Sequence, residues 1–206
     1  MIDRLGPNGG QQNRHALPAV LNLPADSADA AKVVAATQRW LMRAVIGLNL
    51  CPFAKAVHVK QQIRYAVTDA QTADELLAEL EHEFRHLLQT DANELDTTLL
   101  IHPQVMGEFL DFHFFLAEAD ALLRRLELDG VFQIASLHPH YEFAGSQPDD
   151  IANHTNRAPY PTLHLLREAS IDRAVAAFPD AAKIFEKNID TLQQLGHEGW
   201  ERLWRT

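Results

Sequence analysis

The hydrophobic positions in the first half of the chain predict alternating helices and strands. Between residues 26 and 47, apolar side chains recur every three or four positions, which predicts an amphipathic helix. Residues 61–67 alternate between apolar and polar positions, as expected for a half-buried strand. Thr72 and Glu75 have the spacing of a capping box, and the apolar periodicity after them predicts a second helix.

The middle of the chain continues this alternation. A run of apolar and β-branched residues at 97–101 predicts a central strand that is buried on both faces. Helical spacing at 105–126, followed by another apolar run at 131–137, predicts a long helix and a third strand. This order is a βαβαβ pattern, and right-handed crossovers would make its small sheet mostly parallel, with helices flanking it.

The ends of the chain complete the predicted architecture. Residues 1–25 are rich in Gly, Pro, Asn and Gln and are expected to form a flexible arm. We predict that residues 26–206 form a single α/β (or α+β) domain with a long functional loop after the third strand. Its C-terminal third is expected to be helical, with segments at 162–168, 170–177 and 180–194 and further turns around Trp200 and Trp204.

Composition narrows the class of protein. The chain has 206 residues, and its fractions of 47% hydrophobic and 22% charged residues are typical of a soluble globular protein. A net charge of −10, with no cluster among the 18 Lys and Arg residues, argues against a nucleic-acid partner. No apolar run reaches the roughly 20 residues that cross a bilayer. The single cysteine fits a reducing compartment, so we expect a cytoplasmic protein without a membrane partner.

Candidate chemistry concentrates where the predicted strands end. His102-Pro and His138-Pro each follow a strand, and ligands bind at the carboxyl ends of parallel strands. His138, His140 and Glu142 would point to one side if the chain stayed extended. Together with His102, they match the ligand set of a divalent metal such as zinc, iron or manganese. A metal-free polar site and a purely structural loop are the alternatives.

A second cluster lies in the loop at 138–161. Arg157, beside Asn153 and Asn156, suits the carboxylate or phosphate of a small anionic molecule, because guanidinium offers a planar donor fork. We assign these three residues and Tyr141 to substrate binding. The alternative is that Arg157 pairs internally and holds the loop shut. Its predicted partner in that case is one of two neighbouring acids, Asp149 or Asp150.

Cys51 is the only thiol of the chain and has two interpretations. Near Lys55 and His58 its pKa could be lowered, which would make it a nucleophile, or it could bind a metal. A free cysteine next to Leu50 and Phe53 is more often a small buried hydrophobic residue, and this is the favoured interpretation.

Four sequence words give the chain a family resemblance. They are NLCPFAKAV, LLIHP, QIASLHPHYEFAG and DDIANHTNRAPYPTLHLLREASI, and they fall between about Trp40 and Val175. With them the chain resembles a family of bacterial proteins classed as a domain of unknown function. The resemblance marks the segments chosen above as the family signature and implies no reaction or cofactor.

These observations leave three hypotheses for function. The first is an enzyme, specifically a metal-dependent hydrolase of a small anionic substrate, with His138, His140, Asp149 and Asp150 as catalytic groups. The second is a non-enzymatic protein that binds a metal or metabolite. The third is a structural or interaction module in which the loop is a rigid docking surface.

Overall fold

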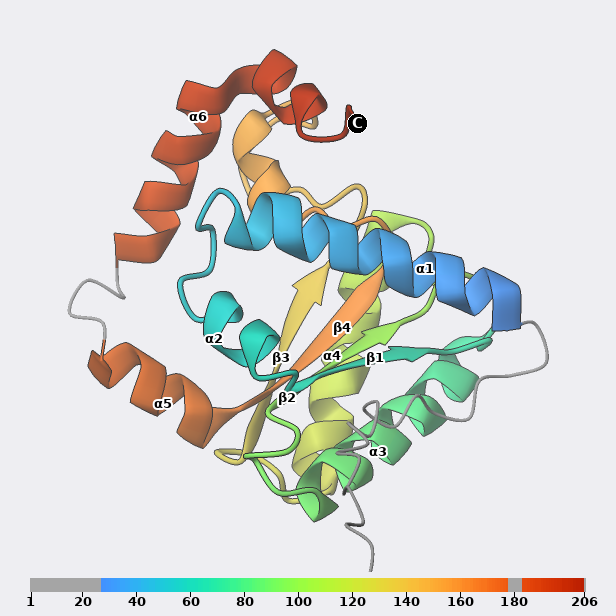
Figure 1. Ribbon diagram of the computed structural model, residues 1–206. Coiled ribbons are helices and arrows are strands. Elements are labelled where there is room, and N and C mark those ends of the chain that lie inside the picture. The colour runs from blue at the N-terminus through green and yellow to red at the C-terminus, as the bar shows by residue number, and fades with distance from the viewer. Residues whose placement is uncertain (1–26, 178–182, 206) are drawn as a thin grey trace, which may run out of the picture.

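Four strands form one sheet in the order β1–β2–β4–β3, in a computed structural model that describes residues 27–177 and 183–205 (Figure 1). β1 pairs with β2 in parallel, whereas β4 runs antiparallel to both β2 and β3. The strands are β1 (Ile63–Val67), β2 (Thr97–Ile101), β3 (Phe132–Leu137) and β4 (Thr162–Arg167). The predicted arm at residues 1–25 lies outside the described residues.

The mixed α/β class is confirmed, but the mostly parallel βαβαβ sheet is wrong. The error lies at residues 162–168, which were expected to be helical and instead form β4. Leu163 and Leu165 are fully buried against the helices on one face, while Thr162 and His164 face the other side. A six-residue run of this kind is too short for periodicity to separate strand from helix. Because β4 inserts between β2 and β3, it separates the two strands that carry the predicted site.

Helices cover both faces of the sheet (Figure 1). On one face lie α1 (Ser27–Trp40), its continuation as a π-helix at Leu41–Ile46, and the short α2 (Ala54–Val59). On the other face lie α3 (Ala73–Gln89) and α4 (Phe109–Arg125), which enclose the larger part of the core.

Two local predictions hold in detail. The capping box opens α3, because the backbone N–H of Glu75 donates to the Thr72 hydroxyl and the Thr72 N–H donates to the Glu75 carboxylate. All five residues of β2 are buried, as expected for a central strand with helices on both faces.

Among the described C-terminal residues, a 3₁₀-helix of the loop precedes β4 and two helices follow this strand. The 3₁₀-helix η2 (Ile151–Thr155) packs against α6 (Ile184–Arg202), and α5 (Glu168–Ala177) follows β4 directly. α6 is kinked at Gly196, where φ is 64°. Its Trp200 packs toward the α1 face. Of the helices described, none is long and apolar enough to span a membrane.

Candidate functional site

The two strand-end histidines lie at the same edge of the sheet, although their strands are not neighbours. β2 and β3 both run antiparallel to β4, and Thr162 at the start of β4 is in register with Ile101 on one side and Leu137 on the other. His102 and His138 therefore follow their strands on either side of β4. Both histidine side chains are fully buried.

Each histidine holds one carbonyl of the segment that leads into α4. His102 Nδ1 lies 3.0 Å from the Val105 oxygen, and His138 Nε2 lies 3.1 Å from the Met106 oxygen. The ring of Phe112 on α4 contacts both imidazoles, with centroid distances of 5.6 and 5.2 Å. Met106 adopts a φ of 58°, which is unfavourable for a side chain with a Cβ. The two histidines thus brace a strained turn at the start of α4.

Burial keeps these imidazoles neutral. It lowers the pKa of His102 to about 4 and also lowers the pKa of His138. His138 Nδ1 accepts a hydrogen bond from the His140 backbone N–H at 3.0 Å, so its proton is on Nε2. His102 donates through Nδ1, and its buried Nε2 has no hydrogen-bond partner among the described residues.

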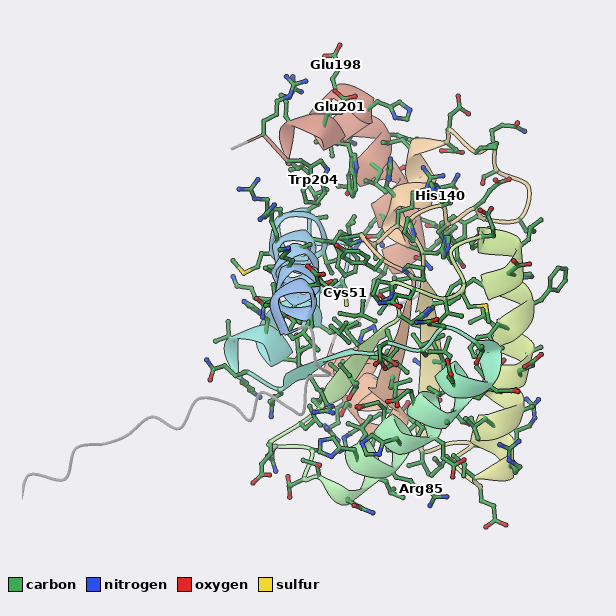
Figure 2. The ribbon with its side chains drawn as sticks, turned by 90° about the vertical axis from the view of Figure 1, so that its right-hand side faces the viewer. Cys51, Arg85, His140, Glu198, Glu201 and Trp204 are labelled. Carbon is green, nitrogen blue, oxygen red and sulfur yellow. The ribbon has the colours of Figure 1, made fainter. Side chains whose placement is uncertain are left out.

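The predicted metal-ligand set of His102, His138, His140 and Glu142 does not come together. The chain turns after β3, where the Tyr141 N–H donates to the His138 oxygen, so the extended run that would align alternate side chains is missing. Both ring nitrogens of His138 are engaged within the protein, and His140 is exposed (Figure 2). Within the described ranges, no group of three or more His, Cys, Asp or Glu side chains is arranged to hold a metal ion.

Asn153 organises the interior of the 138–161 loop and is fully buried. Its Oδ1 accepts from the Phe143 N–H and the Ser146 hydroxyl, and its Nδ2 donates to the Gln147 oxygen at 2.8 Å. Asp150 caps the 3₁₀-helix through the N–H of Ala152. The hydrogen bonds of both side chains therefore lie within the loop.

Arg157 and Asn156 act within the loop as well. The guanidinium donates to the backbone oxygens of Tyr141 and Pro148, at 3.0 and 2.6 Å, rather than to the predicted carboxylate partners. Burial lowers the pKa of Arg157, and the nearby charges of Glu142 and Asp150 oppose that shift. The Asn156 amide donates to the Ser136 oxygen of β3. Of the predicted site residues, Asp149 and His140 are the exposed ones.

Cys51 lies partly buried beneath α1 (Figure 2). Burial raises the pKa of its thiol, and hydrogen bonds from the backbone of Phe53 and Ala54 offset this only in part. A raised pKa is the opposite of the activation that a nucleophilic thiol needs. The geometry therefore supports the small hydrophobic interpretation.

A pocket of about 480 Å³ lies beside the braced turn and was not foreseen from the sequence. Phe114, which lines the pocket, is 71% exposed, and Leu110, one turn earlier on α4 and outside the lining, is 66% exposed. The available signal was the run at 109–115, FLDFHFF, which holds more apolar residues than one buried helix face requires. The pocket is lined by Ala73, Val105, Met106, Gly107, Glu108, Asp111, Phe114, Phe115 and Glu118.

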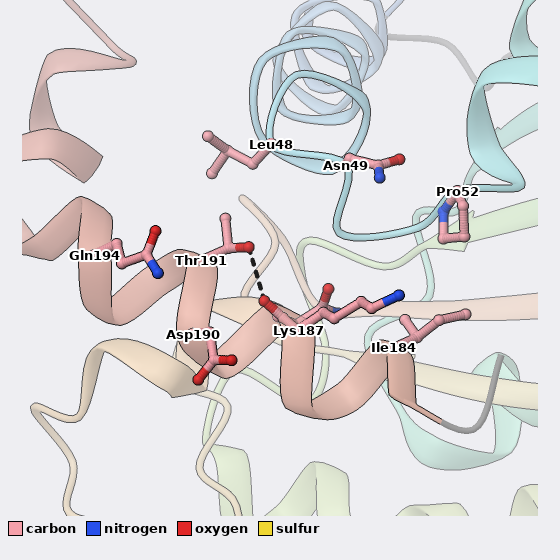
Figure 3. A pocket seen from close by; sticks show the side chains of 9 residues that line it. Leu48, Asn49, Pro52, Ile184, Lys187, Asp190, Thr191 and Gln194 are labelled. Atoms are coloured by element: carbon pink, nitrogen blue, oxygen red, sulfur yellow. Dashed lines mark hydrogen bonds between the residues drawn. The ribbon is translucent and has the colours of Figure 1, made fainter. Parts of the chain in front are cut away.

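A second, smaller pocket of about 270 Å³ separates α6 from the turn after the π-helix (Figure 3). Lys187 and Asp190 bring opposite charges to its α6 side. The buried Asn188 side chain donates to the Leu50 oxygen at 2.9 Å, which ties α6 to this turn. We therefore interpret the pocket as a feature of the packing between α6 and this turn.

Fold and site together define a mixed α/β protein in which the strand-end histidines and the side chains of the 138–161 loop bond mainly to the protein's own backbone. The family model described as DUF1415, a protein of unknown function, matches residues 32–202, and the chain belongs to this family. No curated protein and no solved structure matches the chain.

Proposed function

We propose that this protein is an interaction module that binds a partner segment carrying basic residues next to apolar ones. The observation that supports this most is the exposure of Leu110 and Phe114 beside the α4 pocket. They are four residues apart and so share one face of the helix. Exposed apolar patches rimmed by polar residues are typical of protein–protein contact sites.

Charge at the pocket favours a cationic partner. Glu108, Asp111 and Glu118 line it, and no Lys or Arg is among the residues that do so. The whole chain carries a net charge of −10, which would also steer a basic segment toward it. Phe114 and Met106 would hold apolar groups of the partner while the carboxylates pair with its basic side chains.

The pocket wall is held in place before any partner arrives. His102 and His138 fix the carbonyls of Val105 and Met106, and the Tyr141 ring packs on Phe109 at 5.1 Å. A preformed surface loses less conformational entropy on binding. In this proposal the loop serves as a rigid support and α4 carries the docking surface. The proposal therefore keeps the interaction module of the third hypothesis but moves its surface from the loop to α4.

The two hypotheses based on an anionic substrate or a metal have less support. They require Arg157 and Asn153 to be open to a ligand, whereas Arg157 donates to two loop carbonyls and the buried Asn153 forms its hydrogen bonds within the loop. They also require His138 as a ligand or base, and both of its ring nitrogens are engaged.

Selection from a phage-displayed library of random peptides tests the proposal. We expect enrichment of peptides with Lys or Arg beside aromatic or aliphatic residues. Phe114→Ala should weaken the binding of a selected peptide about tenfold or more, because exposed aromatic anchors dominate small interfaces. The double variant Glu108→Lys/Asp111→Lys should abolish it at low salt.

Leu88→Ala supplies the matched control, since Leu88 is 52% exposed at the opposite end of α3 and lies outside the pocket. This variant should bind selected peptides like the unmodified protein. Circular dichroism would verify that each variant is folded. Enrichment of acidic or uncharged peptides, or binding that Phe114→Ala leaves intact, would refute the proposal.

A further inference from the structure

β3 is an edge strand, and the register of the sheet shows which of its backbone groups point outward. The His102 N–H donates to the Pro161 oxygen, so the carbonyls of Pro161, Leu163 and Leu165 face β2. The alternate residues of β4 then bond to their partners in β3, which are Gln133, Ala135 and Leu137. Phe132, Ile134 and Ser136 therefore direct their N–H and C=O groups away from the sheet.

Two of these six outward groups have partners nearby. The Phe132 N–H donates to the Leu128 oxygen at 3.1 Å, and the Ser136 oxygen accepts from the Asn156 amide at 3.4 Å. Four groups remain without a partner among the described residues: the Phe132 C=O, both groups of Ile134, and the Ser136 N–H.

The edge also lacks the usual protection. Its sequence, FQIASL, contains no charged residue, proline or glycine, which are the features that normally prevent an edge strand from pairing. Gln133, Ile134, Ala135 and Ser136 are each partly accessible and the adjoining Val131 is 40% exposed, whereas Phe132 between them is 2% exposed. An incoming strand would thus meet an uncharged surface.

We propose that β3 pairs with β3 of a second copy of this chain, antiparallel and about a two-fold axis at Ile134. In this register the N–H of each Ile134 donates to the C=O of the other. Each Ser136 N–H donates to the partner copy's Phe132 C=O. The four free groups of one chain are therefore the complement of the same four groups in another, which is the requirement for a two-fold interface.

The register leaves no outward group unsatisfied. A complete ladder in this register would form a second hydrogen bond in the same residue pair, from the Phe132 N–H to the Ser136 C=O, but Leu128 and Asn156 already bond these two groups. The same two contacts mark the ends of the open stretch. The product is one continuous sheet of two sets of four strands, with two edges covered.

Cross-strand charges test both the dimer and its register. The pairing places Gln133 directly opposite Ala135 of the partner copy, and both side chains are partly accessible on the same face of the sheet. The variant Gln133→Lys/Ala135→Lys puts like charges opposite each other and should weaken dimerisation at least tenfold. The variant Gln133→Lys/Ala135→Glu puts opposite charges in the same places and should retain the dimer.

Analytical ultracentrifugation across a range of concentrations measures the outcome, and thermal melts verify that both variants are folded. We expect the unmodified protein to reach twice the mass of the chain at high concentration. A protein that stays monomeric would overturn the proposal. A dimer that the two-lysine variant leaves intact, or that both variants lose equally while folded, would overturn this interface.

Discussion

At the scale of single residues, the strand-end histidines illustrate how burial changes the pKa of a side chain and hence its role. His102 and His138 each donate one N–H to a carbonyl in the segment before α4, and both sit against Phe112. In this setting a positive charge would lose its hydration, which is why their pKa values are lowered. Their role is to position the turn at Val105 and Met106.

The lowered pKa of His102 predicts a loss of stability in mild acid. Its pKa is about 4 in the folded protein against an ordinary value of 6.5. As the pH falls from 6.5 toward 4, the unfolded chain takes up a proton that the folded chain does not, which favours unfolding. The full effect is about 3 kcal/mol for this residue.

Urea unfolding at a series of pH values between 7 and 4.5 measures this dependence. His102→Asn keeps a donor for the Val105 oxygen and removes the titrating group, so its stability should fall less steeply with acid. Part of the slope should remain, because burial also lowers the pKa of His154 and His164 to about 4. Equal slopes in the two proteins would contradict the assignment to His102.

Asn153 provides a second prediction at this scale. Asn153→Asp replaces the Nδ2 donor with an oxygen that faces the Gln147 carbonyl in a fully buried position. We expect a loss of about 3 kcal/mol in the free energy of unfolding. The same change at exposed Asn93 should have little effect. Chemical denaturation of both variants makes the comparison, and equal stabilities would argue against the role of Asn153 as the centre of the loop.

At the scale of elements, the end of α4 carries an avoidable strain. The N–H of Leu128 donates to the Leu123 oxygen and the N–H of Glu127 donates to the Arg124 oxygen, which is the pattern of a Schellman motif. This motif favours glycine at the position of Glu127, where φ is 58°. The exposed glutamate therefore holds a left-handed conformation without a compensating contact in the described structure.

Glu127→Gly should stabilise the protein by about 1 kcal/mol, because glycine adopts this conformation without the clash of a Cβ. The control is Ala117→Gly, at an exposed position in the middle of α4, where glycine should cost about 1 kcal/mol. Thermal unfolding measures whether each variant is more or less stable than the unmodified protein. A destabilised Glu127→Gly variant would show that the left-handed position carries no strain.

At the scale of the whole molecule, the two proposed surfaces use different parts of the fold. The pocket lies at the start of α4, whereas the pairing edge comprises residues 132–136 of β3, and no residue belongs to both. A dimer would therefore present two copies of the pocket. Two linked pockets would increase the avidity for a partner that carries repeated basic segments.

Independence of the two surfaces is itself testable. The Gln133→Lys/Ala135→Lys variant should bind a selected monovalent peptide with unchanged affinity, and Phe114→Ala should dimerise like the unmodified protein. Isothermal titration calorimetry and ultracentrifugation measure the two properties separately. A change in peptide affinity on dissociation would instead show that the surfaces are coupled.

Elements whose signals are local could be predicted from the amino-acid sequence. The capping box at Thr72 starts α3, and the apolar run at 97–101 is a fully buried strand, because both depend on neighbouring residues along the chain. That residues 162–167 form a strand between β2 and β3 could be seen only in the folded protein. That choice depends on hydrogen bonds to distant strands, which no short pattern encodes.

The same distinction applies to the site. The sequence placed His102 and His138 at strand ends, and it identified the polar loop that follows. Whether those side chains were free for chemistry depended on partners far along the chain, such as the Met106 oxygen for His138. The tertiary structure satisfied most of those buried polar groups internally, with the Nε2 of His102 as an exception, and left Phe114 exposed. The physical reason is that an unpaired buried polar group costs more free energy than an exposed apolar side chain.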